Sequence, residues 1–400
     1  MVKQLYESKN MCCGCSACYA VCPVNAISMI ADDEGFKYPQ VDPKLCVGCK
    51  KCELVCPLKS TRDQQQPLAI YAAKNKNESI RKNSSSGGMF PLLANYVEAQ
   101  DGVIYGAAFD EQCKVTHMRA EAPKEWKKLC GSKYVQSDMN DVFTSVKNDL
   151  CNDRTVLFSG TPCQIDGLIH YIKAAKVSPE KLITCDIVCH GTPSPKVWDD
   201  YLNFLLNRTK KDIGFVSFRD KHQSGWHNST ITIRNHTGEV IFSESQQQNY
   251  FFQLFLCHLI IRPSCHECKY ANFHRPGDIS LGDFWGIEKN FAHFDDNKGV
   301  SLVIINSQKG ARIWNDLQNS TDHLVVSQNQ CTQPNLVAPS KKNRSRGSFW
   351  RWYRKYGIKI AGQRMGYVSK NILEQFTILC LRCWEKLISL TSANRKCKDD

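Results

Sequence analysis

Residues 12–23 read CCGCSACYAVCP, and residues 46–57 read CVGCKKCELVCP. Each cysteine of the second stretch lies 34 positions after its equivalent in the first, and Gly14 and Gly48 keep the same offset. The N-terminal part of the chain is therefore an internal duplication, in which Cys13 is the one additional cysteine. Between the two stretches, residues 31–42 are predicted to form a hairpin that turns near Gly35.

The spacing within each stretch is typical of iron–sulfur ligands. Three closely spaced thiolates can hold three corners of a cubane, while the remote cysteine of the Cys-Pro pair binds the other cluster. Zinc also binds paired Cys-x2-Cys, but it rarely uses three evenly stepped cysteines followed by Cys-Pro, twice over. We therefore predict two [4Fe-4S] clusters with crossed ligands. One set is Cys12, Cys15, Cys18 and Cys56, and the other is Cys46, Cys49, Cys52 and Cys22.

The 22 cysteines of this 400-residue chain fit either a secreted disulfide scaffold or an intracellular metalloprotein. Residues 1–11 have no apolar core of a secretory signal, and the longest nearly apolar run, 251–261, is far too short to span a membrane. A secreted disulfide scaffold is therefore not supported, and we expect a cytoplasmic protein whose cysteines bind metal or carry out redox chemistry. With 42% hydrophobic residues, the chain can bury the cores of two or three domains.

The positive charge is concentrated at the C-terminal end. Of the formal net charge of +13, residues 341–400 contribute +11, which leaves +2 for residues 1–340. Residues 341–359 mix eight basic residues with five aromatic ones, and residues 372–390 are predicted to form an amphipathic helix. Three alternatives remain open for this tail. It binds nucleic acid, it binds an anionic membrane surface and places the protein at the inner face of the membrane, or it is a solvated helix face whose aromatic side chains pack on the protein.

A strand–helix–strand unit is predicted at strand 155–159, helix 164–176 and strand 182–188. Such a crossover makes its strands parallel, so their carboxyl ends, followed by Cys163 and Cys189, lie on one edge of the sheet. With the Cys-x2-Cys pair Cys265 and Cys268, they form a candidate four-thiolate site. The alternative is inert buried cysteines, which we expect for Cys151, Cys185 and Cys331, and core packing is expected for Cys380 and Cys383.

Other elements follow from periodicity and turn residues. We predict a strand at 103–109, a helix at 194–207, a hairpin of 230–234 with 239–242, and a final core strand at 301–306. The serines and glycines of residues 83–88 precede a predicted helix at 89–99, where free N–H groups could bind phosphate or simply be capped. The chain has no Gly-x-Gly-x-x-Gly, Walker A, His-Glu-x-x-His or nucleophile-elbow motif, so nicotinamide Rossmann and Ser/His/Asp hydrolase functions are not supported.

Several motifs in order resemble the coenzyme F420 hydrogenase/dehydrogenase beta-subunit family, from about residue 10 to 320. They are the duplicated cysteine repeat, Ser85-Ser-Gly-Gly, Gly131-Ser-Lys-Tyr-Val-Gln-Ser, Gly160-Thr-Pro-Cys-Gln, Cys189-His-Gly-Thr-Pro-Ser, Arg262-Pro-Ser-Cys-x2-Cys and Gly282-Asp-Phe-Trp-Gly. Membership implies an iron–sulfur flavoprotein oxidoreductase that passes electrons from ferredoxin-type donors through clusters to FAD. From FAD the electrons pass to an organic two-electron acceptor. In the reverse direction, a deazaflavin such as coenzyme F420 supplies the electrons. The alternative is a non-catalytic electron-transfer subunit of a larger redox complex.

The resemblance also implies particular residues. It supports a third [4Fe-4S] cluster at Cys163, Cys189, Cys265 and Cys268. It implies flavin contacts at Ser85, Ser86, Gly87, Gly88, Gly131, Ser132, Lys133, Tyr134 and Thr161. Lys133 is a candidate for charge neutralisation, with a surface lysine as the alternative, and His190 is a candidate for tuning the third cluster, with the cap of a turn as the alternative. Asp283 and Trp285 are candidates for the flavin pocket, with a tryptophan buried in the core as the alternative. Candidate anion contacts are Arg219, Asp220, Lys221 and Arg275. Relatives with this architecture commonly occur among polysaccharide-biosynthesis genes, which implies a role in that process.

Together, these patterns predict α+β and α/β architecture. We expect a dicluster ferredoxin-like domain at residues 1–60, followed by a mixed α/β flavin and iron–sulfur domain. The latter comprises two parts that correspond to the N-terminal domain of the family, at 68–150, and to its C-terminal domain, at 151–325. A basic aromatic tail with the amphipathic helix occupies residues 326–400.

Overall fold

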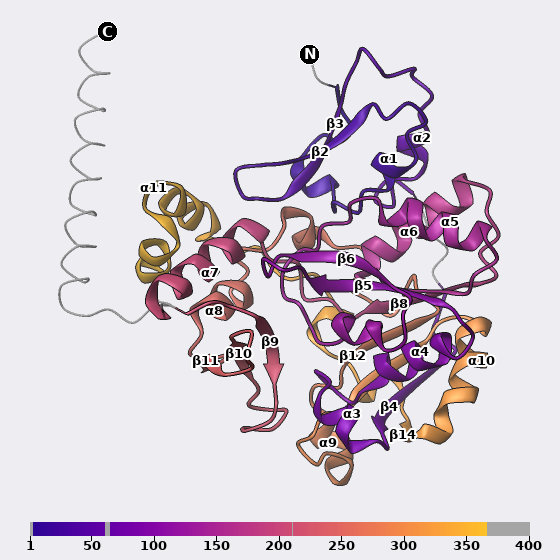
Figure 1. Cartoon of the computed structure of the whole chain (residues 1–400), viewed down its shortest axis with the longest axis vertical. Helices are drawn as coiled ribbons and strands as arrows, with labels where there is room; N and C mark the ends of the chain where they lie inside the picture. The colour runs from indigo at the N-terminus through magenta and orange to yellow at the C-terminus, as the bar shows by residue number, and fades with distance from the viewer. Residues whose placement is uncertain (1–2, 61–64, 210, 366–400) are drawn as a thin grey trace. The chain divides into compact units, whose positions relative to one another are not determined.

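The computed structural model describes residues 3–60, 65–209 and 211–365 (Figure 1). The chain divides into two compact units: residues 1–246 with 261–341, and residues 247–260 with 342–400. The first unit contains all twelve cysteines of the three predicted ligand sets, so their arrangement can be followed within one body.

The N-terminal domain combines a small antiparallel sheet with the two cysteine loops. Its strand order is β1-β3-β2, and the β2–β3 hairpin confirms the predicted turn at Gly35, whose φ is 82°. The elements are β1 (Lys3–Gln4), the 3-10 helix η1 (Lys9–Met11), α1 (Ala17–Ala20), β2 (Ile27–Ala31), β3 (Lys37–Val41) and α2 (Lys51–Leu54).

The backbone repeats the duplication seen in the sequence. Gly14 and Gly48 have φ values of 71° and 70°, and Ser16 and Lys50, at the next equivalent positions, have 65° and 58°. Glycine adopts positive φ at little cost, which explains why both loops carry it at this position. Each loop leads into a one-turn helix, so the two repeats fold alike.

An eight-stranded sheet forms the centre of the first unit (Figure 1). Its order is β14-β4-β13-β12-β8-β7-β5-β6; the neighbours β12, β8, β7 and β5 are parallel, and the remaining pairs are antiparallel. The strands are β4 (Ala69–Asn75), β5 (Val103–Phe109), β6 (Val115–Ala120), β7 (Val156–Gly160), β8 (Leu182–Ile187), β12 (Ile279–Asp283), β13 (Ser301–Ile305) and β14 (Thr321–Val325).

Helices cover both faces of this sheet. One face packs against α4 (Met89–Glu98) and α10 (Gln308–Leu317) in a continuous apolar core. The other face packs against α5 (Val142–Cys151) and α6 (Pro162–Ala174), and the same core includes Cys13, Cys15 and Ala17 of the N-terminal domain. The apolar contact of the two domains therefore lies beside the carboxyl end of β7, where Cys163 begins α6.

The predicted strand–helix–strand unit is confirmed as β7, α6 and β8, with β7 and β8 parallel. The predicted hairpin is confirmed as β10 and β11, which belong to a separate sheet of order β11-β10-β9. The core strand predicted at 301–306 is confirmed as the fully buried β13, but β14 follows it and pairs with β4 at the sheet edge. The strand β14 was not predicted, because its exposed Val325 and alternating polar residues resemble a loop sequence.

The remaining elements connect these layers. They are α3 (Glu78–Lys82), η2 (Glu125–Leu129), α7 (Pro195–Thr209), β9 (Phe215–Asp220), β10 (Thr230–Arg234), β11 (Val240–Ser245), η3 (Pro263–Glu267), α9 (Ile287–Phe291), η4 (Ala292–Phe294), η5 (Gln318–Ser320), η6 (Gln328–Gln330) and η7 (Pro334–Leu336).

The second unit is built from α8 (Tyr250–Leu256) and α11 (Arg346–Arg364). The α11 side chains Phe349, Trp350, Trp352 and Tyr353 are buried, and Trp350 Nε1 donates to the Leu259 carbonyl oxygen at 3.0 Å. The basic residues between these aromatics, such as Arg351 and Arg354, are exposed. Of the three alternatives for this stretch, the structure therefore favours the solvated face with packed aromatics.

No helix among the described residues is long and apolar enough to cross a membrane. The amphipathic helix predicted at 372–390, with Cys380 and Cys383, lies outside the described residues.

Candidate functional site

Two cavities in the N-terminal domain are lined by the duplicated cysteines. One includes the predicted first set in its lining, Cys12, Cys15, Cys18 and Cys56, together with Cys13 and Cys52. The other includes the predicted second set, Cys22, Cys46, Cys49 and Cys52. The last cysteine of each repeat thus faces the group formed by the opposite repeat, which is the crossing expected for two-cluster ferredoxins.

The third predicted set comes together from three separate segments. Cys163 lies in the first turn of α6, Cys189 follows β8, and Cys265 and Cys268 lie within and directly after η3. The pKa of Cys189 is raised well above its usual value, first by burial and then by the nearby Cys265, Cys163 and Cys268. The carboxyl edge of the sheet therefore collects the four thiols that the topology predicted.

The chemistry of these thiols fits iron–sulfur clusters. All twelve are free, and burial is the main cause that raises the pKa of Cys12, Cys18 and Cys265. Among the described residues, no three His, Cys, Asp or Glu side chains are grouped to hold a single metal ion. Each of the three sets offers four thiols, and a cubane takes one thiolate at each of its four irons.

Arg262 joins the first and third sets. It is 1% exposed and lies three residues before Cys265, yet its Nε donates to the Cys12 carbonyl oxygen at 2.7 Å, and its Nη2 lies 3.6 Å from Cys12 Sγ. Nη2 also donates to the Lys37 carbonyl oxygen at 3.0 Å, and Nη1 donates to Gln136 Oε1 at 2.9 Å. In the sequence, Arg262 stands out only as part of a motif, and no role was predicted for it.

Cys13, the additional cysteine of the first repeat, lies between the same two sets. Its hydrogen bond with Cys15 is the largest cause that raises its own pKa, and its hydrogen bond with Cys163 is the largest cause that raises the pKa of Cys163. Gly167 on α6 makes this approach close, because a Cβ there would lie 2.8 Å from Cys15 Sγ. The first and third thiol groups are therefore neighbours through side-chain contacts.

The two segments predicted to bind flavin meet in the structure. The backbone N–H of Ser132 donates to Ser85 Oγ at 2.8 Å. Gly87 is packed so tightly that a Cβ would lie 2.4 Å from the Ala73 carbonyl oxygen and 2.6 Å from the Ser301 nitrogen. Gly131 has a φ of 83°, and nothing lies within 4 Å of a Cβ built there. The segment at Gly87 is therefore packed tightly against the sheet, while there is open space beside Gly131.

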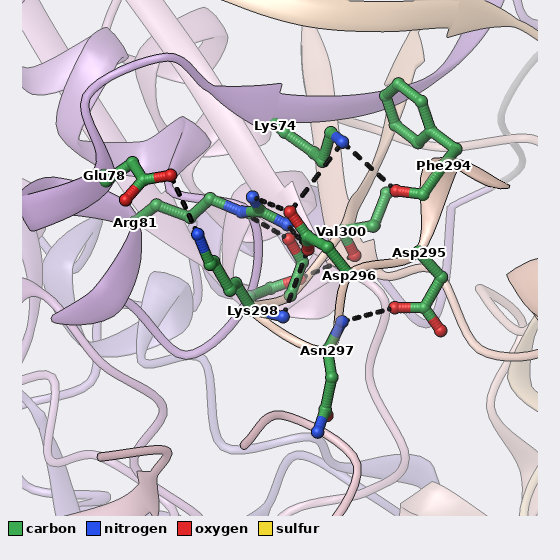
Figure 2. A network of polar contacts seen from close by, with 12 residues as sticks. Lys74, Glu78, Arg81, Phe294, Asp295, Asp296, Asn297, Lys298 and Val300 are labelled. Atoms are coloured by element: carbon green, nitrogen blue, oxygen red, sulfur yellow. Dashed lines mark hydrogen bonds and ion pairs between the residues drawn. The ribbon is translucent and has the colours of Figure 1, made fainter.

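Figure 2 shows a polar network around Arg81, Asp296 and Val300, and the Ser86 hydroxyl of the first segment donates to the Val300 carbonyl oxygen at 2.8 Å. Arg81 pairs with Asp296 and donates from Nε to the Gly299 carbonyl oxygen at 2.9 Å. Buried Lys221 donates to three backbone carbonyls: Arg81 at 2.9 Å, Ser86 at 2.8 Å and Lys298 at 2.7 Å. Lys221 therefore anchors the serine–glycine loop and spends all three of its N–H donors on backbone, rather than on an anion as predicted.

His117 supports the second segment from beneath. Its Nε2 lies 3.0 Å from the Ser159 carbonyl oxygen and its Nδ1 lies 2.8 Å from Ser137 Oγ. Because a carbonyl only accepts, Nε2 carries the hydrogen and Nδ1 accepts from the Ser137 hydroxyl. Burial lowers the pKa of His117 to about 4, so the ring is neutral and can accept this bond. Sequence reasoning missed His117, which sits in a strand with no motif around it.

Lys133 of the second segment is half-buried and donates to the carbonyl oxygens of Lys128 at 3.1 Å and Cys130 at 2.7 Å. Burial lowers the pKa of Lys133 to about 7. The Lys133 side chain is therefore not in the environment of a surface lysine. Thr161 lies apart from this loop pair in the hydrogen-bond pattern: its hydroxyl is 3.3 Å from Cys163 Sγ, beside the third thiol set.

A buried cation with spare donors lies near Tyr134. The Arg219 side chain is 3% exposed, and its Nε and Nη2 have no hydrogen-bond partner in the described part of the chain. Nη2 lies 3.7 Å from Asp283 Oδ1, and the guanidinium carbon lies 4.9 Å from the Trp285 ring centre. Trp285 in turn stacks on Trp226, with 5.0 Å between ring centroids and an interplanar angle of 4°. Such an arrangement suits a planar, electron-rich ligand.

Several single-residue expectations need correction. Trp285 is 42% exposed and not part of a core, while Cys151 is exposed and not buried. Arg275 is paired with Asp186 in a buried ion pair at 2.6 Å, so it is not available to an external anion. His190 contacts Asn335 Oδ1 from Nδ1 at 3.0 Å, which supports the structural alternative of holding a neighbouring turn.

Two known families match different parts of the chain. Residues 11–60 match the 4Fe-4S dicluster domain. Residues 153–328 match the family described as the C terminus of the coenzyme F420 hydrogenase/dehydrogenase beta subunit. A segment similar to this beta-subunit family therefore follows a dicluster domain in the chain. The resemblance drawn from the motifs is confirmed, and the chain is an iron–sulfur redox protein related to the beta subunits of an oxidoreductase family.

Among solved structures, one similar chain comes from the F420-reducing [NiFe] hydrogenase complex of Methanosarcina barkeri, in a xenon-derivatised form. The two chains are 17% identical, with a TM-score of 0.46, and the match covers 66% of this chain and 85% of that chain.

Proposed function

We propose that this chain is an iron–sulfur flavoprotein oxidoreductase with three [4Fe-4S] clusters and one FAD. The observation that carries the proposal is the continuity of the three thiol groups. Cys52 lines both N-terminal cavities, and the free thiol of Cys13 is hydrogen-bonded to Cys15 on one side and to Cys163 on the other. Electron transfer between centres needs such close approach, and separate structural metal sites do not.

When bound, the clusters would carry single electrons and the flavin would exchange them for the electron pair of an organic compound. The chain's own residues provide position and electrostatics. Arg262 and Thr192 direct N–H groups toward the thiols, since the Thr192 amide lies 3.5 Å from Cys265 Sγ. Ser85 and Ser132 hold the two flavin segments together, and the spare donors of Arg219 are available to the ring system.

The finer parts of the proposal rest on the family resemblance. We infer ferredoxin-type donors, an organic two-electron acceptor or coenzyme F420, and a role in polysaccharide biosynthesis. The flavin residues are Ser85, Ser86, Gly87, Gly88, Gly131, Ser132, Lys133, Tyr134 and Thr161. An anionic membrane surface as a further partner draws no support from the aromatic residues of α11, because these are buried.

An anaerobic spectral titration tests the proposal. The reconstituted, FAD-loaded chain is reduced with ferredoxin and then mixed with candidate acceptors, including F420. Sequential bleaching of cluster and flavin bands, followed by reoxidation by one acceptor, is expected. Cluster bleaching in a chain that binds no flavin would instead assign it to the electron-transfer part of a larger complex.

A further inference from the structure

The duplication gives the N-terminal domain two copies of one surface, formed by residues 13–17 in the first repeat and by residues 47–51 in the second. In the first repeat this face is buried: Cys13 is 9% exposed, Ser16 8% and Ala17 0%. The equivalent residues of the second repeat are exposed: Val47 is 65% exposed, and Lys50 and Lys51 are both at the surface. Because the backbone conformations match, the difference lies in what covers each face.

The first face is covered by the chain's own body. Ala17 and Cys15 pack against Gly167 of α6, and the Cys13 thiol is hydrogen-bonded to Cys163. This contact brings the first thiol group next to the third. The buried face of the first repeat is therefore the one through which its cysteines meet the next group.

The second face carries a different set of side chains, which we call the second-repeat face: Lys44, Leu45, Val47, Lys50, Lys51 and Leu54. Its apolar members are unusually open for their type, since Leu45 is 52% exposed and Leu54 is 72% exposed. Cys46 and Cys49 of the second ligand set are themselves exposed between them. A thiol group that reaches the surface amid apolar side chains is typical of a protein contact, not of a solvated loop.

We propose that the second-repeat face docks a small acidic protein that carries one electron. This inference rests on the proposed function, because it concerns the partner of the second cluster. In the transfer, one electron leaves the carrier and one arrives at the group held by Cys22, Cys46, Cys49 and Cys52, with no bond made or broken.

Charge selects this occupant. From residue 44 to residue 54 the chain has three lysines and one acid, Glu53, and the first-repeat equivalents of the lysines are Asn10, Ser16 and Ala17, so these three positive charges are particular to the open copy. Lysines around an apolar centre attract a negatively charged partner and raise its rate of encounter. A second copy of this chain, with a formal net charge of +13, would bring the same positive face against itself.

The duplication also supplies the test variants. Lys50→Ser with Lys51→Ala, and separately Leu54→Ala, place the first-repeat residues on the second-repeat face without a new backbone demand. Lys82→Ser with Lys173→Ala is the matched control, since it removes two exposed lysines elsewhere in the same unit. The probe is an acidic plant-type ferredoxin, and its dissociation constant for the reconstituted full chain is measured by calorimetry at several salt concentrations.

We expect the Lys50/Lys51 variant to bind at least tenfold more weakly at low salt, with a flatter salt dependence, at unchanged iron content. Leu54→Ala is expected to weaken binding at all salt concentrations, while the control binds like wild type. Equal weakening in the control, or no weakening in the Lys50/Lys51 variant, would overturn the docking site. Sedimentation that shows a wild-type dimer dissolved by the same substitutions would assign the face to a second copy and also overturn it. A wild-type chain that binds the ferredoxin but holds no iron would refute the proposed function and not the surface.

Discussion

Arg262 donates a hydrogen bond from Nε to the carbonyl oxygen of Cys12 at 2.7 Å and directs Nη2 toward the sulfur of the same residue at 3.6 Å. The two residues are 250 positions apart in the chain. Arg262 also lies 4.2 Å from the Tyr38 ring centre, so its charge is enclosed by the N-terminal domain. A residue of the third thiol segment thus completes the environment of the first thiol set.

The first prediction concerns this charge. Arg262→Met is expected to lower the midpoint potential of the first cluster by roughly 60 mV, a tenfold change for a one-electron couple. The reason is that a reduced cluster carries one more negative charge, which a buried guanidinium stabilises. The unfolding free energy is also expected to fall by about 3 kcal/mol, because two buried carbonyl oxygens lose their donor.

Arg262→Lys separates the two effects. It keeps the charge but not the fork of donors, so the potential is expected to stay closer to wild type while stability still falls. The midpoint potential is measured by potentiometric titration followed by electron paramagnetic resonance. An unchanged potential in Arg262→Met would show that Arg262 acts on structure alone.

The second prediction contrasts two glycines of the flavin segments. Gly87→Ala is expected to destabilise the chain by about 2 kcal/mol or more and to abolish flavin binding, since its Cβ would lie 2.4 Å from the backbone oxygen of Ala73. Gly131→Ala meets no atom, so only its positive φ is penalised, by about 1 kcal/mol. Thermal unfolding and flavin content measure both. Equal behaviour of the two variants would argue against a pinned 85–88 segment.

The third prediction is a pH dependence caused by His117. An unfolded chain protonates this residue near its usual pKa of 6.5, but burial lowers the pKa in the folded chain to about 4. The unfolded state therefore binds more protons between these values, and the free energy of unfolding falls as pH drops through this window, by up to about 3 kcal/mol. His117→Gln, which does not titrate, is expected to lose this part of the dependence. Anaerobic denaturant titrations between about pH 7 and pH 5 compare the two chains, and parallel curves would contradict the assignment.

The fourth prediction separates Cys13 from the ligands. Cys13→Ser is expected to retain about twelve irons per chain, whereas Cys163→Ser falls to about eight, because only Cys163 belongs to a ligand set. Iron analysis after anaerobic reconstitution gives the result. A loss of iron in Cys13→Ser as large as in Cys163→Ser would make Cys13 a ligand.

Local patterns in the sequence were enough to predict much of this arrangement. The spacing of Cys12 to Cys22, repeated after 34 residues, and the strand ends before Cys163 and Cys189 are short-range features that survive folding. Parallel strands share their carboxyl edge, so the meeting of distant cysteines followed from topology alone.

Other features depend on contacts that no local pattern encodes. The reach of Arg262 to Cys12, the bond between Ser132 and Ser85, and the exposure of Trp285 are set by how whole segments pack. Lys221 is a further example. Its neighbours in the sequence suggested an anion site, but its three N–H groups donate to three backbone carbonyl oxygens. One signal was available: an arginine three residues before a Cys-x2-Cys pair is a natural partner for buried thiolates.

The measurement that tests the account most directly is the iron and flavin content of the full chain after anaerobic reconstitution. Three [4Fe-4S] clusters and one FAD predict about twelve irons and one flavin per chain. A preparation that is stable with bound zinc, little iron and no flavin would contradict the account.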